Sequence, residues 1–183
     1  MNSNKSKIKT NYKWVVRIVL ISVAASMAFS FASSEILGRA GNIVAFLILV
    51  VFIGVGVIFD IIGVAATTAP EAPFHSMAAH RERGAAEALR LLKNAEKVSS
   101  FCNDVVGDVS GIISGATAAR ITAKLMQSVT TESILLQLLI SGTVTGLMIG
   151  GKAIGKTVAL NNSTAIVLRV GKLINLVRLK KRG

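Results

Sequence analysis

The chain has 183 residues, of which 52% are hydrophobic and only 16% are charged. This balance, with several apolar runs of about twenty residues, predicts an all-α integral membrane protein and excludes a soluble globular domain. The formal net charge is +12, but the basic residues cluster beside apolar runs, which favours anionic lipids over nucleic acid as partners. The single cysteine, Cys102, excludes an intrachain disulfide.

The N-terminal region combines a basic segment with a first apolar run. Residues 1–13 contain four lysines, and residues 14–32 are apolar apart from Arg17. Two interpretations remain open. The length of the run favours a membrane anchor, whereas the small residues at its end are also typical of a cleaved signal peptide. We expect the anchor.

The second span is predicted over residues 42–67, and it is more apolar than the first. Its single charge, Asp60, lies in the last third, where an ionised carboxylate that faces lipid would cost about 3 kcal/mol. An ordinary hydrogen bond at the interface would explain this residue, but its apolar surroundings favour membership of a polar cluster.

Residues 68–97 are predicted to connect the second and third spans. Pro70 and Pro73 indicate a structured loop over residues 68–80, whose two histidines lack the spacing of metal ligands. The periodicity of residues 81–97 predicts an amphipathic helix along the membrane surface. Its apolar and polar faces are expected to carry, respectively, Ala85, Ala88, Leu89, Leu92 and Ala95, and Arg83, Glu87, Arg90 and Lys97.

The third span, predicted over residues 98–119, carries several polar side chains. Asp104 and Asp108 are four residues apart and share one face of a helix, with Asn103 next to them. Glycines recur at 107, 111 and 115, and small residues at this spacing let a neighbouring backbone approach closely. Because intramembrane carboxylates mark functional sites, we expect this packing face to be the functional face as well.

The fourth span is predicted over residues 134–158, with Lys152 and Lys156 in its last third. Within this span, glycines at positions 142, 146 and 150 form a second ladder with the same spacing as in the third span. Asn161-Asn162-Ser163 is expected to cap a C-terminal amphipathic helix. The apolar stripe of this helix is predicted to consist of Ile166, Val170, Leu173 and Val177.

Lysine and arginine concentrate in residues 1–17, 81–97 and 156–182. The positive-inside rule therefore predicts four spans with both termini cytoplasmic, in a multi-pass protein of the plasma (inner) membrane. This topology is expected to bring five polar side chains from three helices to a similar depth in the inner leaflet: Asp60, Asn103, Asp104, Asp108 and Lys152.

The connection contains the string Ala88-Leu89-Arg90-Leu91-Leu92-Lys93-Asn94-Ala95-Glu96-Lys97. This string, between one span and two further spans with a juxtamembrane helix, resembles the transmembrane domain of the cyclin-M (CNNM)/CorC family of magnesium transport proteins. The resemblance covers residues 42–176. It implies a CorC-like transmembrane domain at residues 35–183, preceded at residues 1–34 by a basic N terminus and an extra span, and it implies a homodimer.

The resemblance also implies where Mg²⁺ would bind, and the chain departs from the family there. Members coordinate Mg²⁺ with serines of the first shared span, an asparagine of the next, and the glutamate of a Gly-Glu-x-x-Pro-Lys motif. Here Asp60 stands in the region of the serines, Asn103 roughly at the asparagine, and Lys152 at the glutamate. We expect no counterpart of the family's nucleotide-binding and CBS-type domains after the juxtamembrane helix.

Two functions are compatible with these residues. The preferred one is transport of a divalent cation, with Mg²⁺ as the first choice, because carboxylate and amide oxygens are hard ligands. Its predicted metal ligands are Asp60, Asn103, Asp104 and Asp108, with Lys152 as a modulating charge. Three aspartates and one lysine sum to a charge of −2, which a divalent cation would neutralise. Proton-coupled exchange through the same buried groups also stays open.

The alternative function is that of a non-transporting membrane interaction or scaffold protein. In this interpretation Lys152 replaces the ion as a permanent counter-ion and fixes the packing of the helices. We do not expect an enzyme, because no span contains a histidine that would activate a serine, and no phosphate-cradling or metalloprotease motif is present.

Overall fold

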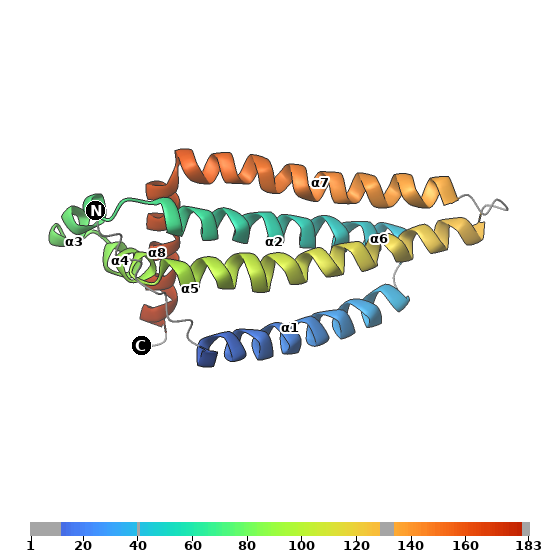
Figure 1. Ribbon diagram of the computed structural model, residues 1–183, viewed down its shortest axis with the longest axis horizontal. Helices are drawn as coiled ribbons and strands as arrows, with labels where there is room; N and C mark the ends of the chain where they lie inside the picture. The colour runs from blue at the N-terminus through green and yellow to red at the C-terminus, as the bar shows by residue number, and fades with distance from the viewer. Residues whose placement is uncertain (1–11, 40, 129–133, 181–183) are drawn as a thin grey trace, which may run out of the picture.

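Four long helical segments run side by side along the molecule (Figure 1). They are α1 (Tyr12–Arg39), α2 (Asn42–Thr68), a continuous segment over residues 95–128, and α7 (Ile134–Asn161). The structure is a computed structural model that describes residues 12–39, 41–128 and 134–180, and no β-strand occurs in these ranges. The start of α1 lies at the same end of the molecule as α8 (Ser163–Lys180) (Figure 1).

The prediction of an all-α, membrane-compatible chain is confirmed. Within the described residues, three helical stretches are long and apolar enough to cross a bilayer: Tyr12–Phe31, Ile43–Thr68 and Gln137–Asn161. The segment that carries Asp104 and Asp108 lies beside them in the bundle (Figure 1). Its two aspartates and basic residues make it less apolar than these three stretches, so the fourth span stays a prediction.

The connection between α2 and the third long segment differs from the prediction. Residues 68–80, expected as a loop, contain α3 (Ala72–Ala79), with Pro73 in its first turn, where the missing proline N–H breaks no helical hydrogen bond. The single helix expected over residues 81–97 is divided into α4 (Ala85–Leu92) and α5 (Ala95–Ser100).

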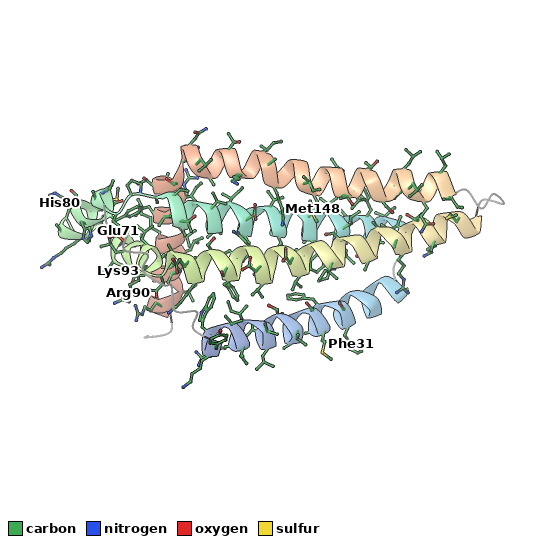
Figure 2. All side chains as sticks on the ribbon, in the orientation of Figure 1. Phe31, Glu71, His80, Arg90, Lys93 and Met148 are labelled. Carbon is green, nitrogen blue, oxygen red and sulfur yellow. The ribbon has the colours of Figure 1, made fainter. Side chains whose placement is uncertain are left out.

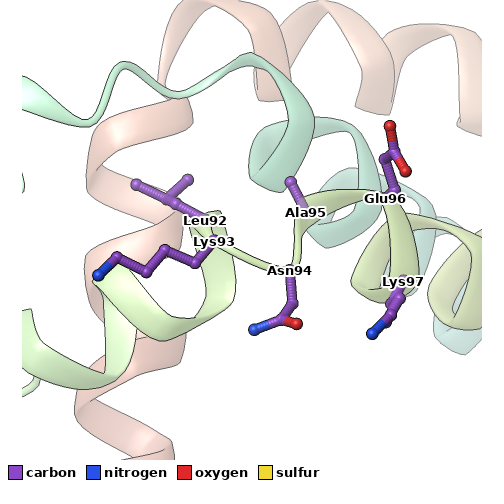
Figure 3. A pocket seen from close by; sticks show the side chains of 6 residues that line it. All are labelled: Leu92, Lys93, Asn94, Ala95, Glu96 and Lys97. Atoms are coloured by element: carbon purple, nitrogen blue, oxygen red, sulfur yellow. The ribbon is translucent and has the colours of Figure 1, made fainter.

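The break between α4 and α5 lies at Lys93 and Asn94. The side-chain amide of Asn94 donates a hydrogen bond to the carbonyl of Arg90 over 3.0 Å. The break leaves a shallow pocket of about 370 Å³ lined by residues 92–97 (Figure 3). The string that carries the family resemblance therefore spans a helix break and not a regular amphipathic helix.

The central helix of the bundle is α2, which contacts α5, α6, α7 and α8. Glycines permit its close packing. A Cβ on Gly56 would lie 3.2 Å from the Cβ of Ser110, and a Cβ on Gly155 of α7 would lie 2.8 Å from Cγ1 of Ile61. On another side, α1 packs against α6 and η1 (Phe101–Gly107), and an edge-to-face pair of rings, Phe29 and Phe52, with centroids 6.1 Å apart, connects it to α2.

The last helix, α8, runs across the end of the bundle (Figure 1) and packs against α4 and α2. The two backbones meet at Gly84, which precedes α4, and Gly171 of α8. A small apolar core lies at this end and consists of Ala65, Phe74, Ala88, Leu92, Ala159 and Val167. Asn162 donates its side-chain amide back to the carbonyl of Val158 of α7 over 3.2 Å, so this bond ends α7 and does not cap α8.

The crossing of α4 and α8 buries a carboxylate that was predicted to lie on the polar face. The Glu87 side chain is only 10% exposed. One of its oxygens accepts a hydrogen bond from Nδ2 of Asn175 over 3.1 Å, and the other lies 3.7 Å from Nη1 of Arg178. The prediction was wrong because α8 covers this side of α4, which the local periodicity does not reveal.

Glu87→Gln is expected to remove a pH-dependent part of the stability. The Asn175 hydrogen bond is the main cause of a lowered Glu87 pKa, with smaller contributions from Arg90 and Arg178. A lowered folded-state pKa stabilises the fold above the ordinary value of 4.5, and this stability is lost as pH falls through the lowered pKa. Thermal unfolding between about pH 5 and pH 3 should therefore depend less on pH in the variant than in wild type.

The matched control for this measurement is Glu71→Gln, at a carboxylate that is 53% exposed. This control should keep the pH dependence of the wild type. If the stability of Glu87→Gln depended on pH as in wild type, the contact of the Glu87 carboxylate with Asn175 and Arg178 would not contribute to the stability of the fold.

Candidate cation site

The helix that carries three of the predicted ligands changes its winding where they occur. After α5, residues Phe101–Gly107 form a π-helical segment, η1, and α6 continues over Asp108–Ser128. Short π segments inside α-helices are frequent at functional sites. They also rotate the side chains that follow relative to those that precede. No pattern in the sequence predicted this segment.

Asn103 points from η1 toward α2. Its Nδ2 donates a hydrogen bond to Oγ of Ser99 over 3.2 Å, whereas its Oδ1 is buried and has no hydrogen-bond donor among the described residues. Oδ1 faces Gly63 of α2 so closely that a Cβ on that glycine would overlap it. A buried carbonyl oxygen without a donor costs about 1–3 kcal/mol, and a cation bound there would satisfy it.

Asp60 lies on the side of α2 that faces α6. It follows Gly56 by four residues and precedes Gly63 by three, so the three positions share one helix face. Gly56 contacts Ser110 and Gly63 contacts Asn103, which places Asp60 between these two contacts along the interface. The carboxylate is partly exposed and has no hydrogen bond or ion pair to another residue in the described ranges.

Lys152 reaches the same level from α7. Its Nζ lies 3.5 Å from the point where a Cβ on Gly107 would be, and the carbonyl oxygen of Cys102 lies 3.4 Å from that point. The glycine therefore leaves room for the ammonium beside the π segment. No ion pair joins Lys152 to a carboxylate in the part of the chain that the structure describes.

Asp104 and Asp108 lie on a different face. Both are exposed on the outer side of η1 and α6, where Phe101 is 43% and Ile112 is 61% exposed. Asn103 and Asp104 are consecutive residues of a helical segment, so their side chains point in different directions. Only one of the two can face α2.

The three regularly spaced glycines of the third segment, Gly107, Gly111 and Gly115, have different neighbours. A Cβ on Gly111 would lie 3.1 Å from Cε of Met148, which points from α7 into the space between α7 and α6 (Figure 2). A Cβ on Gly115 would meet nothing within 4 Å. Gly107 and Gly111 therefore lie beside side chains of α7, whereas the two aspartates are exposed.

The five predicted site residues thus form two groups. The inner group has Asn103 of η1 against α2, Lys152 of α7 beside η1, and Asp60 on the face of α2 between the Gly56 and Gly63 contacts, whereas Asp104 and Asp108 are exposed. Among the described residues, no three His, Cys, Asp or Glu side chains are grouped so that they could hold a metal ion. The inner group therefore offers one carboxylate and one amide oxygen, beside one ammonium.

Comparison with models of known protein families, with curated proteins and with solved structures finds no match to this chain. The fold and the inner group of polar residues are therefore the basis for the function proposed below.

Asn103→Leu is expected to show whether Oδ1 is a ligand. Leucine has a similar volume and removes the unpaired oxygen, so without divalent ions the variant should unfold at the wild-type temperature or above it. Stabilisation by added Mg²⁺ should then be lost, as measured by thermal unfolding in detergent. Ser99→Ala removes only the partner of Nδ2 and should keep the response to Mg²⁺. An equal Mg²⁺ response in Asn103→Leu and wild type would exclude Oδ1 as a ligand.

Proposed function

We propose that the protein transports a divalent cation, with Mg²⁺ as the first choice, through the polar group at the contact of α2, η1 and α7. The observation that carries the proposal is the buried Oδ1 of Asn103, which has no donor among the described residues. Asp60, on the adjacent helix face, supplies a carboxylate without an ion-pair partner in the described ranges. Such oxygens are the ligands that Mg²⁺ and Ca²⁺ prefer.

In this mechanism the ion keeps part of its hydration shell. One carboxylate and one amide oxygen are too few for a complete protein cage, and Mg²⁺ commonly retains several waters beside one or two carboxylates. Asp104 and Asp108 would act at a distance. Because carboxylates are costly against lipid, we propose that they border an aqueous approach to the site and attract cations to it.

Lys152 would act as a modulating charge. Its ammonium beside Gly107 repels a cation that enters the site, so transport requires this side chain to move away. The resulting competition between the ion and a tethered ammonium would lower affinity and permit release.

A second function is supported by the position of Lys152. The proximity of Lys152 Nζ to the π segment is also what a non-transporting membrane scaffold would need, with the ammonium as a permanent counter-ion of the polar group. The variants of Lys152 described in the Discussion separate the two functions.

The direct test of transport uses purified protein in liposomes and measures the flux of Mg²⁺, Mn²⁺, Co²⁺ and Na⁺. We expect divalent flux above that of empty liposomes and a loss of about tenfold or more in Asp60→Asn, because the only carboxylate of the inner group is neutralised. Asp104→Asn should have a smaller effect. Absence of divalent flux in the wild-type protein would contradict the proposal.

We also propose a homodimer in the inner (plasma) membrane, with both termini cytoplasmic. The second glycine ladder supports a helix partner outside this subunit, because a Cβ on Gly142, Gly146 or Gly150 would meet nothing within 4 Å. Small residues at this spacing are typical of close helix pairs in membranes.

Gly146→Leu is expected to separate such a dimer, since a leucine would force the two backbones apart. The measurement is particle size in detergent, with thermal unfolding as a check that the subunit still folds. Gly111→Leu is the contrasting variant. A side chain at position 111 would meet Met148 of the same subunit, so this substitution should destabilise the fold itself. An unchanged size in Gly146→Leu would exclude this ladder as the interface.

A further inference from the structure

The position of α8 gives it a role separate from the cation site. Its first residue, Ser163, follows the last residue of α7, Asn161, with one residue between them. Because α7 contains the candidate span Gln137–Asn161, α8 begins where that span ends. It then crosses the end of the bundle (Figure 1), so its axis would lie along the membrane surface if the long helices span a bilayer.

One side of α8 is fully engaged with the protein. Val167 and Gly171 are buried against α4 and the core at this end. Two of its basic residues are paired: Lys172 lies 3.1 Å from Glu82, and Arg178 lies 3.7 Å from Glu87. The carboxylates of Glu82 and Glu87, in the segment between α2 and α5, thus neutralise these two basic side chains of α8.

The opposite side of α8 is apolar and uncovered. Leu173, Leu176 and Val177 are 64%, 65% and 66% exposed. Arg169 precedes Leu173 by four residues and Leu176 by seven, so it lies on the same face. It is exposed, and no carboxylate in the described ranges pairs with it.

We propose that this face, formed by Arg169, Leu173, Leu176 and Val177, rests on the inner leaflet and binds anionic phospholipid. The three apolar side chains would enter the boundary between head groups and acyl chains, as in interfacial amphipathic helices. The guanidinium of Arg169 would bind a lipid phosphate with two parallel hydrogen bonds.

Three features favour a lipid surface over a protein as the occupant. The helix is held at the end of a candidate span by a single intervening residue. Its axis runs across the bundle, and the unpaired cation lies within the apolar face and not at its polar edge. Lipid binding to this face would hold α8 at a fixed depth in the membrane surface. It would hold α4 there as well, because α4 and α8 meet at Gly84 and Gly171.

The insertion of α8 can be measured by tryptophan quenching. In a Trp14→Phe background, a single tryptophan is placed at Leu173 or, as control, at His80, which lies at the far end of the molecule from the bundle (Figure 2). Both proteins are reconstituted in vesicles of equal parts phosphatidylcholine and phosphatidylglycerol with brominated acyl chains. Quenching at position 173 should be at least about threefold stronger than at position 80. Equal quenching would overturn the proposal.

Two further outcomes are decisive. Arg169→Gln should remove most of the extra thermal stability that phosphatidylglycerol gives over phosphatidylcholine alone, whereas Arg83→Gln, at an exposed basic residue of the connection, should not. Equal effects of the two variants would overturn the assignment of Arg169 to lipid phosphate. A tryptophan at position 173 that is shielded from both brominated lipid and aqueous iodide would show that protein covers the face, which also overturns the proposal. None of these readouts depends on transport.

Discussion

Gly84→Ala should destabilise the protein by about 2–5 kcal/mol, as measured by thermal or denaturant unfolding in detergent. Gly84 has φ +83°, a conformation that costs an L-residue about 1–2 kcal/mol. An added Cβ would also lie 2.5 Å from the backbone N of Lys172 and 2.7 Å from its Cα. Backbone atoms cannot move aside as a side chain can, so α8 would have to shift away from α4, with an overpacking cost of about 1–3 kcal/mol.

Gly171→Ala separates the two contributions to this effect. Gly171 does not have a positive φ, but its added Cβ would overlap the carbonyl oxygen of Gly84 and lie 3.0 Å from the N of Ala88. It should therefore show the packing cost alone. Gly54→Ala is the control, because its Cβ would meet nothing within 4 Å and alanine favours a helix by about 1 kcal/mol. A loss of stability in Gly84→Ala no larger than in this control would contradict the observed crossing of α4 and α8.

The long helices could be predicted from the sequence because their apolar runs are long and their ends are marked. The second span was expected over residues 42–67, and α2 covers Asn42–Thr68. The division of residues 81–97 could not be predicted in the same way. The burial of Glu87 is equally hidden in the local sequence, because it depends on the contact with α8, about 80–90 residues further along the chain. Local periodicity contains no information on such a partner.

The sequence indicated the level of the site residues along the helices, but it did not indicate the direction in which each side chain points. The order of the spans and the positions of Asp60, Asn103 and Lys152 along them indicated a shared level. The contacts at Gly63 and Gly107 place Asn103 against α2 and Lys152 beside η1. The direction of each side chain depends on the winding of the helix. The π segment Phe101–Gly107 changes that winding, so a regular helical wheel could not predict which of Asn103 and Asp104 faces α2.

Lys152→Met should strengthen the binding of a divalent cation by about tenfold or more, because a unit positive charge is removed from the neighbourhood of the site. Lys152→Glu should strengthen it further, since it adds a carboxylate at the position where the family that the chain resembles has one. Both expectations follow from the position of Lys152 Nζ beside Gly107 and from its lack of an ion pair in the described part of the chain.

The scaffold interpretation gives the opposite result for the same variants. If the ammonium is a permanent counter-ion, its removal leaves buried negative charge uncompensated, at a cost of about 3–5 kcal/mol. That cost is a large share of a typical folding stability. Asp60→Asn combined with Lys152→Met should then be milder than Lys152→Met alone, because both partners of the pair are removed together.

The measurement that separates these possibilities most directly is a titration of thermal stability against Mg²⁺, from an EDTA-treated start, for wild type, Lys152→Met and Lys152→Glu. For a divalent-cation transporter we expect the half-maximal Mg²⁺ concentration to fall in this order, with the stability of both variants maintained when Mg²⁺ is present. A large fall in melting temperature for Lys152→Met that Mg²⁺ does not reverse, and that Asp60→Asn relieves, would contradict transport through this site.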